Sequence, residues 1–68
     1  MPDSKAMPTI GSRVNELRIR DGQRDWRVIY RVDDDAIVIA EVFQKKSQKT
    51  PKRVIETSQR RLREYDDA

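Results

Sequence analysis

Residues 13–43 contain three segments with the sequence pattern of β-strands: in the first two, large apolar side chains recur with a two-residue period, and the third is a short apolar run rich in β-branched residues. Asp21-Gly22, a dipeptide typical of hairpin turns, separates the first two segments, and three consecutive aspartates at 33–35 separate the second from the third. Strands joined by such short turns pair antiparallel with their neighbours in sequence. The pattern therefore predicts an antiparallel meander. Its strands are expected at residues 13–20, 25–33 and 36–43.

A helix is expected after the last of these strands. Thr50 and Pro51 have the residue types preferred at a helix N-cap and at the first helical position. An apolar stripe at helical spacing then continues to about Tyr65. The order of elements predicts an α+β fold, a small antiparallel sheet of three or four strands with a C-terminal helix. The residues of the helix stripe are Val54, Ile55, Ser58, Leu62 and Tyr65.

A chain of 68 residues forms one domain at most, and we expect this domain to span residues 13–65. Residues 1–12 are punctuated by proline and glycine and are interpreted as an irregular N-terminal arm. The alternative is that they form a strand or an arm that packs Met7 and Ile10. Residues 66–68 are expected to be a frayed tail.

The segment 36–43 is apolar on both faces up to Glu41, which is typical of a central strand covered on both sides. A single helix covers one face of a sheet, so the other face is predicted to lack a cover. A domain this small buries only about 60% of its unfolded surface and usually needs a disulfide, a metal or a partner. The chain has no cysteine, so a partner is favoured, and we expect a homodimer or a higher oligomer.

The absence of cysteine and histidine excludes several classes of site. The chain has no thiolate nucleophile, no disulfide and no ordinary set of zinc or copper ligands. The aspartates at 33–35 lack the distal glutamate of a calcium loop, so no metal and no cofactor are expected. No apolar run reaches membrane-spanning length, and the first residues do not read as a signal peptide. A cytoplasmic protein is therefore the expectation.

The charges are unevenly distributed along the chain. Between Val42 and Arg63 there are eight lysines and arginines against one acid, Glu56, whereas the whole chain has 15 basic and 12 acidic residues. Such a stretch is typical of a surface that binds the phosphates of RNA or DNA. The alternative is ordinary solubility charge on a solvated face. The candidate RNA-binding residues are Lys45, Lys49, Lys52, Arg53 and Arg31.

Four arginines occupy like positions on the first two predicted strands, where side chains of neighbouring antiparallel strands share one face. Guanidinium groups gathered on one face repel unless an anion bridges them, so they predict a phosphate-binding patch. The alternative is that acids of the same strands pair with them across the sheet. The arginines are Arg18, Arg20, Arg27 and Arg31, and the acids are Glu16, Asp21, Asp25 and Glu41.

Without histidine or cysteine, acid–base chemistry falls to lysine, arginine, tyrosine or a carboxylate. A ribonuclease of this kind is chemically reasonable, because cations hold the scissile phosphate and stabilise the charge of the transition state. A lysine among like charges is able to act as a base toward the 2′-hydroxyl. Tyr30 and Tyr65 are able to stack on bases or to transfer protons. The alternatives are a core position for Tyr30 and a cap on the helix stripe for Tyr65.

Three segments carry a family resemblance: Leu17-Arg18-Ile19-Arg20-Asp21, Trp26-Arg27-Val28-Ile29-Tyr30 and, over residues 42–51, VFQKKSQKTP. Together they resemble the RelE/ParE toxin superfamily, and more closely its phage-related HigB-like branch. The resemblance extends over roughly residues 6–65. The third segment is the most specific, because it is long and unusual in composition.

The resemblance implies a microbial-RNase-like α+β toxin fold and ribosome-dependent cleavage of mRNA without a cofactor, opposed by a cognate antitoxin. Arg27 is the best match to a catalytic position, since it is the arginine before a Val-x-Tyr strand. Arg18 and Arg20 match basic strand positions, and the basic loop of the branch matches Lys45, Lys46 and Lys49. Tyr65 is the candidate for a C-terminal tyrosine. The implied catalytic residues are Arg18, Arg20, Arg27, Lys46 and Tyr65.

The chain departs from the family pattern at two points. Glu16 falls where the family has a lysine, and the helical hairpin with which family members begin is missing, since the chain starts about where that hairpin ends. The missing hairpin leaves three possibilities open. The chain is a reduced toxin that dimerises, a toxin that needs its antitoxin to fold, or a non-catalytic module that binds nucleic acid or protein. An inhibitor of DNA gyrase of the ParE type fits the superfamily but not the segment 42–51. We expect the ribonuclease toxin, with the binding module as its alternative.

Overall fold

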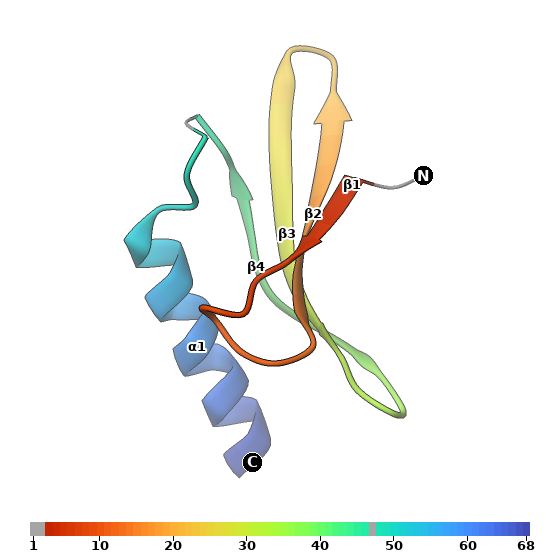
Figure 1. Ribbon diagram of the computed structural model, residues 1–68, viewed down its shortest axis with the longest axis vertical. Helices are drawn as coiled ribbons and strands as arrows, with labels where there is room; N and C mark the ends of the chain where they lie inside the picture. Colours follow the sequence, from red (N-terminus) through yellow and green to blue (C-terminus); the bar gives the residue numbers. More distant parts are fainter. Residues whose placement is uncertain (1–2, 47) are drawn as a thin grey trace.

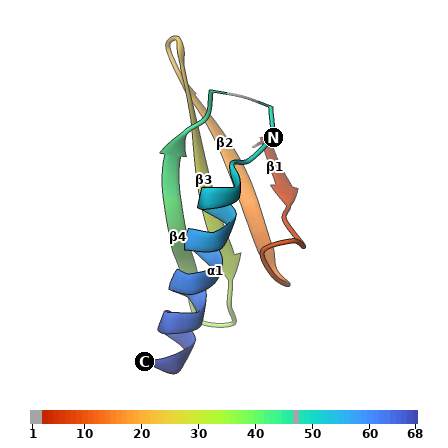
Figure 2. The same cartoon turned by 90° about the vertical axis from the view of Figure 1, so that its left-hand side faces the viewer.

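The computed structural model describes residues 3–46 and 48–68, and its architecture is a four-stranded antiparallel sheet with one helix against one face (Figures 1 and 2). The predicted α+β fold class is confirmed, with the higher of the two expected strand numbers. The strands lie across the sheet in chain order. The elements are β1 (Asp3–Ala6), β2 (Val14–Asp21), β3 (Arg24–Val32), β4 (Ile37–Gln44) and α1 (Lys52–Asp67).

Both predicted turns form. Gly22 has a φ of +63° and lies in the two-residue loop between β2 and β3, and the next residue, Gln23, does not share the positive φ. A positive φ at the first loop residue alone is the type II′ pattern, which suits the twist of a hairpin and is open to glycine. The second turn closes with the Asp33 amide donating to the Ala36 carbonyl oxygen at 2.8 Å.

The irregular arm expected over residues 1–12 is corrected in part, because residues 3–6 form β1 and pair with β2. Residues 1 and 2 lie outside the described residues. The alternative prediction holds for the rest of the arm. The Met7 amide donates to the Val14 carbonyl oxygen at 2.8 Å, and Ile10 is buried in the core. Pairing with β1 satisfies backbone groups that the edge of β2 would otherwise leave open.

The two ends of α1 also differ from the expectation. The N-cap expected at Thr50 does not form, because the helix begins at Lys52, Pro51 holds the cap position and no side chain caps it. The Thr50 hydroxyl instead donates to the buried carboxylate of Glu16 at 2.6 Å. At the other end the helix continues to Asp67, so residues 66 and 67 are helical where a frayed tail was expected.

We call the side of the sheet under α1 the covered face; in β3 it carries Arg27, Ile29 and Arg31. The predicted stripe of the helix packs here through Val54 and Leu62. Tyr65, the last residue of that stripe, is 52% exposed instead. The apolar core is small for a sheet of this size. It consists of Ile10, Val14, Ile29, Ala40, Val54 and Leu62.

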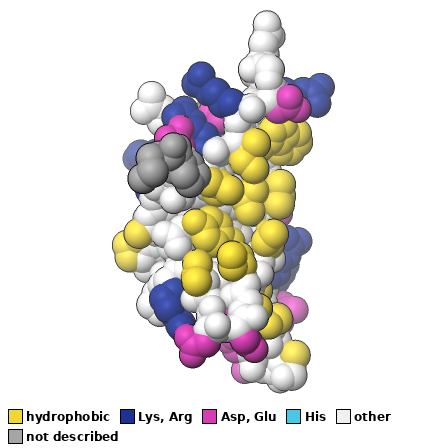
Figure 3. All heavy atoms as spheres, turned by 90° about the vertical axis from the view of Figure 1, so that its right-hand side faces the viewer, with side chains coloured by type: hydrophobic (Ala, Val, Ile, Leu, Met, Phe, Trp, Pro, Cys, Tyr) yellow, Lys and Arg dark blue, Asp and Glu magenta, His cyan; other side chains and the backbone are white. Residues whose placement is uncertain are grey.

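The opposite side of the sheet, the open face, has no cover among the described residues. In β3 it carries Trp26, Val28 and Tyr30, so the core position expected for Tyr30 is wrong: its side chain is only half-buried. The apolar segment 36–43 predicted that one face of the sheet lacks a cover, and the open face is indeed an exposed apolar surface (Figure 3).

β4 is an edge strand rather than the central strand that its apolar sequence suggested. A bulge explains how it presents residues to both sides. Ile29 pairs with Glu41 and Tyr30 with Ile39, so Ala40 is the extra residue. Ala40 is buried in the core while Glu41 reaches Arg61 of α1 at 3.2 Å. A bulge of this kind bends the strand and blunts the edge.

None of the described helical residues belongs to a segment long and apolar enough to cross a lipid bilayer.

Candidate nucleic-acid interface

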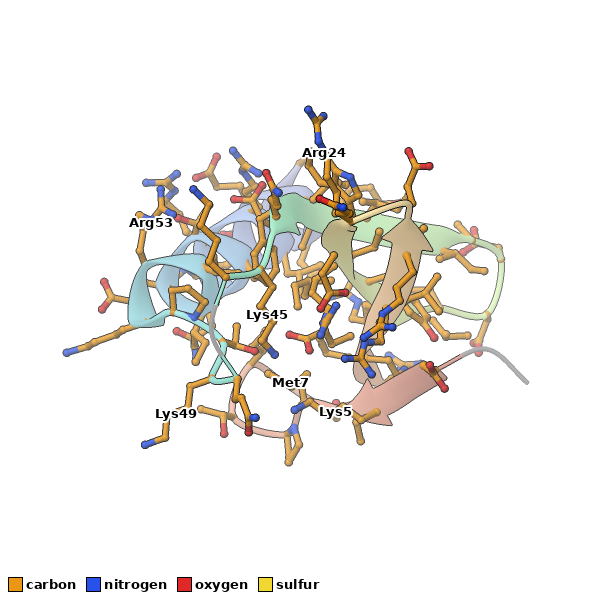
Figure 4. All side chains as sticks on the ribbon, turned by 90° about the horizontal axis from the view of Figure 1, so that it is seen from above. Lys5, Met7, Arg24, Lys45, Lys49 and Arg53 are labelled. Carbon is orange, nitrogen blue, oxygen red and sulfur yellow. The ribbon has the colours of Figure 1, made fainter. Side chains whose placement is uncertain are left out.

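A hollow of about 650 Å³ opens on the covered face beyond the helix. Its lining side chains come from β1, β2, β3 and the segment that follows β4, and none comes from α1. Lys5 and Lys45, labelled in Figure 4, reach it from β1 and from the segment after β4. We call it the basic hollow; it is lined by Asp3, Ser4, Lys5, Glu16, Arg18, Asp25, Arg27, Lys45, Lys46 and Gln48.

Glu16 organises the bottom of the basic hollow. Its side chain is 3% exposed, and Lys45, whose side chain is 4% exposed, donates from Nζ to Glu16 Oε1 at 3.2 Å. Thr50 donates to the other carboxylate oxygen at 2.6 Å. Arg27 adds an ion pair, with 3.5 Å between its Nε and Glu16 Oε1. A buried carboxylate is stable only when its oxygens are paired in this way.

Lys45 is buried because the strand ladder continues past the end of β4. Its amide donates to the Asp25 carbonyl oxygen at 2.9 Å, one step beyond the pairing of Trp26 with Gln44. The alternation of strand side chains then places Lys45 on the covered face with Phe43. The basic loop predicted from the sequence therefore begins with a lysine that is fixed inside the protein.

Asp25 lies between two arginines at the side of the hollow. It accepts a hydrogen bond from Nη1 of Arg27 and lies 3.6 Å from Nε of Arg18. Arg18 and Arg27 are direct cross-strand partners on β2 and β3, so their guanidinium groups would repel without an anion. The carboxylate of Asp25 thus supplies the anion that these two arginines need between them.

The carboxylates of the hollow are held in their ionised form. Burial alone would raise the pKa of Glu16, but hydrogen bonds from Thr50 and Lys45 and the nearby lysine charges lower that pKa below its ordinary 4.5. The hydrogen bond from Arg27, with the charge of Arg18, lowers the pKa of Asp25 below 3.8. Both groups are therefore ionised at neutral pH, and their charges offset those of the arginines and lysines around them.

The basic hollow keeps a surplus of positive charge at its opening. Five of its lining residues are basic and three are acidic. Glu16 and Asp25 offset the buried pair, Arg27 and Lys45. The more exposed cations, Lys5, Arg18 and Lys46, lie closer to solvent. An anion that enters the hollow meets these side chains first.

The structure brings together four of the predicted site residues and leaves six outside. Arg18, Arg27, Lys45 and Lys46 line the hollow. Arg20 lies on the same face but nearer the hairpin, and within the described residues no ion pair involves it. Lys49 and Arg53 extend outward from the loop and from α1 (Figure 4). Lys52 and Arg53 line a second, shallow groove along α1.

Arg31 and Tyr65 lie at the other end of the molecule. Arg31 is committed to two carboxylates, Asp33 at 2.8 Å and Asp66 at 2.6 Å. Tyr65 belongs to the last turns of α1, toward the C-terminus in Figure 1, and lines neither cavity. Of the three consecutive aspartates, Asp33 thus forms an ion pair with Arg31.

Sequence reasoning missed Glu16 and Thr50 as the organisers of the site. Alternation along β2 puts Glu16 on the face of Arg18, and an ion pair with the arginines is one of the two alternatives that the sequence leaves open. Its partners Lys45 and Thr50 lie 29 and 34 residues away. No local pattern identifies partners at such separations. The signal that the sequence does offer is a glutamate that strand alternation places on the same face as two arginines.

One of three comparisons with known proteins identifies a family for this chain. A family model described as phage derived protein Gp49-like (DUF891) matches residues 2–63. No curated protein and no solved structure matches the chain.

Proposed function

Since the chain belongs to the phage-derived Gp49-like family, which is part of the RelE/HigB-type toxin group, we propose that it is the toxin of a toxin–antitoxin pair and that it cleaves RNA. The observation that carries the proposal is the basic hollow. Arg18 and Arg27 converge there on one carboxylate, Asp25, which supports the binding of another anion, a phosphate group, by the same two guanidinium groups.

In the proposed complex a phosphate of the RNA displaces Asp25 from the two arginines. The 2′-oxygen attacks the phosphorus and the bond to the 5′-oxygen breaks. A cyclic phosphate remains on the upstream fragment, and the downstream fragment leaves as a 5′-hydroxyl after its oxygen takes a proton from water. Arg27 and Arg18 stabilise the charge that builds on the non-bridging oxygens. Lys46, at the opening of the hollow, takes the proton of the 2′-hydroxyl. The reaction requires no metal in this scheme.

The remaining predicted residues take different parts in this proposal. Arg20 contacts a neighbouring phosphate on the same face. Lys45 does not contact the RNA in this proposal; its ion pair with Glu16 keeps the lysine inside the protein and holds the glutamate in place. Tyr65 takes no part in the chemistry, because it lies away from the hollow. The substrate that we propose is mRNA on the ribosome, and the opposing partner is a cognate antitoxin; both extend the family resemblance.

The test is translation in a bacterial cell-free extract, with cleaved mRNA ends mapped by primer extension. We expect the wild type to stop synthesis and to leave new 5′ ends. The double variant Arg18→Ala, Lys46→Ala removes two exposed cations and should reduce cleavage by about a hundredfold or more. Arg60→Ala, Arg63→Ala is the matched control, because it removes the same charge from α1 and should cleave as the wild type does.

Arg27 needs a separate variant because its side chain is buried. Arg27→Lys keeps the charge beside Glu16 but loses the two-pronged contact with phosphate, so we expect a folded protein with little cleavage. RNA binding that weakens with salt, without any cleavage by the wild type, would support the non-catalytic binding module instead. Equal cleavage by the hollow variants and the wild type contradicts the proposed site.

A further inference from the structure

The open face is the largest feature of the molecule that the proposed function does not use. Half-buried apolar side chains of β2 and β3 connect the exposed ones into a single surface, which Figure 3 shows as one patch across the middle of the sheet. Its most exposed members are Ile19 (44%), Val32 (43%), Ile37 (65%), Ile39 (62%) and Val42 (53%).

We propose that the open face is the interface between two copies of this chain, packed sheet against sheet. The five most exposed side chains present roughly 500 Å² of apolar surface, which is at the upper end for the largest patch of a monomer. With the half-buried residues between them the surface approaches the roughly 800 Å² per partner of a standard interface. This proposal concerns a different face from the basic hollow and stands apart from the toxin activity.

The charges of the molecule favour a second copy as the occupant. The strand residues that face this side are uncharged except for Asp21 and Arg24, which lie at the hairpin end. An acidic or a basic partner finds no complementary charge in the middle of the face, although the chain has 27 charged residues in all, 15 basic and 12 acidic. An uncharged surface rich in β-branched side chains matches its own copy, as the inner faces of a β-sandwich do.

The edges of the sheet are poor alternatives for self-association. At the bulge of β4, Arg61 donates to the Ala40 carbonyl oxygen at 3.0 Å and the Val42 amide donates to Glu41 Oε1 at 3.1 Å. Side chains therefore already occupy backbone groups that a second strand would need. The other edge is β1, which is only four residues long. Face-to-face packing is the arrangement that remains.

The ends of the open face select the direction of packing. Asp34 and Asp35 lie in the turn at one end, and Arg24 lies at the other. Copies stacked with their strands parallel bring the four carboxylates of two such turns together, which is repulsive. Copies stacked antiparallel keep the two acidic turns apart and place each of them near the hairpin end of the other chain, where Arg24 offsets the charge of its strand partner Asp21. The geometry therefore points to a two-fold dimer with opposed strand directions.

The first test is the mass of the wild-type chain in solution, by sedimentation equilibrium at micromolar concentration. We expect twice the 8.0 kDa of one chain. Ile39→Lys places a charge in the interface of each copy and should raise the dimer dissociation constant by about a hundredfold or more. Tyr65→Lys is the matched control, because Tyr65 is 52% exposed but lies on α1, and it should remain dimeric.

A second measurement does not depend on a destabilising substitution. The chain has no cysteine, so Ile39→Cys introduces its sole thiol. Under mild oxidation this variant should form a covalent dimer much faster than the control Tyr65→Cys, whose position is 52% exposed against 62% for Ile39. For the direction of packing, Arg24→Glu should weaken the dimer, and Asp34→Lys with Asp35→Lys should restore it.

Several results overturn the proposal. A wild-type chain that is folded by circular dichroism yet monomeric at high micromolar concentration excludes the dimer. Equal rates of disulfide formation by the two cysteine variants exclude this face as the interface. Protection of the open face from hydrogen exchange only when a different protein, such as an antitoxin, is added would assign the face to that protein.

Discussion

The two faces of the sheet differ in a way that reverses the usual pattern of a small domain. The covered face buries Glu16, Arg27 and Lys45 beside its apolar core, whereas the open face exposes Ile37 and Ile39 to solvent. In most proteins the buried polar group and the exposed apolar patch are the informative exceptions, and here each occupies one side of the same strands. The covered face is built to hold charges in fixed positions, and the open face is built to be covered.

This comparison separates the proposed site from the proposed interface. Desolvating Glu16, Arg27 and Lys45 costs free energy that their mutual contacts offset only when all the partners are present. A cluster of buried charges with this free-energy cost is expected where chemistry or binding requires it. The apolar groups of the open face carry no such cost when a second surface packs on them, because burial is then favourable. The following predictions test the contrast between the two faces.

The largest effect is expected from the carboxylate under the hollow. Glu16→Gln keeps the shape of the side chain but leaves Lys45 and Arg27 buried without an opposite charge. Removing one partner of a buried ion pair costs roughly 3 kcal/mol or more, which is a large part of the stability of a domain this small. Urea denaturation followed by circular dichroism measures the loss.

Glu56→Gln is the control for this change, since it makes the same substitution on the exposed surface of α1. Glu56 pairs with Lys52 at 3.9 Å with both side chains mostly exposed, and such pairs contribute about 0.3–0.5 kcal/mol. If the two variants lose similar stability, the buried network is not what holds this end of the covered face together.

Acid should destabilise the fold through the ion pairs of the covered face, because among the described residues the middle of the open face has no charged group to titrate. The pKa values of Glu16, Asp25, Asp33 and Asp66 are all lowered, from ordinary values of 4.5 for the glutamate and 3.8 for the aspartates. The stabilisation from a carboxylate with a lowered pKa is complete above its unfolded value and is lost as the pH falls through its folded value. We expect a constant melting temperature from about pH 7 to about pH 5 and a decrease below about pH 4.5.

The check is thermal unfolding across this range for the wild type and for Glu16→Gln. The variant should show a shallower decrease, because one of the responsible carboxylates is gone. A melting temperature that rises on acidification, or that falls already above about pH 5, is incompatible with carboxylates of lowered pKa.

The same substitution on the two faces gives a direct comparison of their packing. Val54 is 2% exposed in the core, and Val42 is 53% exposed on the open face. Val54→Ala should lose about 1–2 kcal/mol, and Val42→Ala only a few tenths at concentrations where the chain is a monomer. Urea denaturation at two protein concentrations measures both. If the open face is a dimer interface, the loss of stability for Val42→Ala grows with protein concentration. If Val42→Ala and Val54→Ala lose the same stability at every concentration, the two faces do not differ in packing.

The sequence predicts those parts of this contrast that depend on residues close together along the chain, and it does not predict the parts that depend on residues far apart. The strands, their turns and the helix are visible because alternation, Gly22 and the stripe from Val54 to Leu62 are local signals. The need for a second cover is visible too, because β4 is apolar on both sides. The position of β4 at the edge is not, since a bulged edge strand that serves two surfaces has the composition of a central one.

Which face the helix covers is the point at which local reasoning fails. Alternation in β3 separates Trp26, Val28 and Tyr30 from Arg27, Ile29 and Arg31, and hydrophobicity alone assigns the first set to the core. The structure places the second set under α1, where Glu16 and Asp25 pair with the buried Arg27. Lys45 and Thr50 in turn hold the carboxylate of Glu16. Those partners come from distant segments, so the choice of face is a property of the assembled fold.

The smallest predicted effect is a gain in stability on the covered face. Ser58 is fully buried beneath α1, and within the described residues its hydroxyl has no hydrogen-bond partner. Ser58→Ala removes this desolvated group and adds helix propensity, so we expect a gain of about 1 kcal/mol, seen as a higher urea midpoint with an unchanged slope. Thr57→Ala, one residue earlier and half-buried, should gain only the propensity. A loss of stability in Ser58→Ala would show that the hydroxyl does have a partner, and that the covered face satisfies even its smallest polar group.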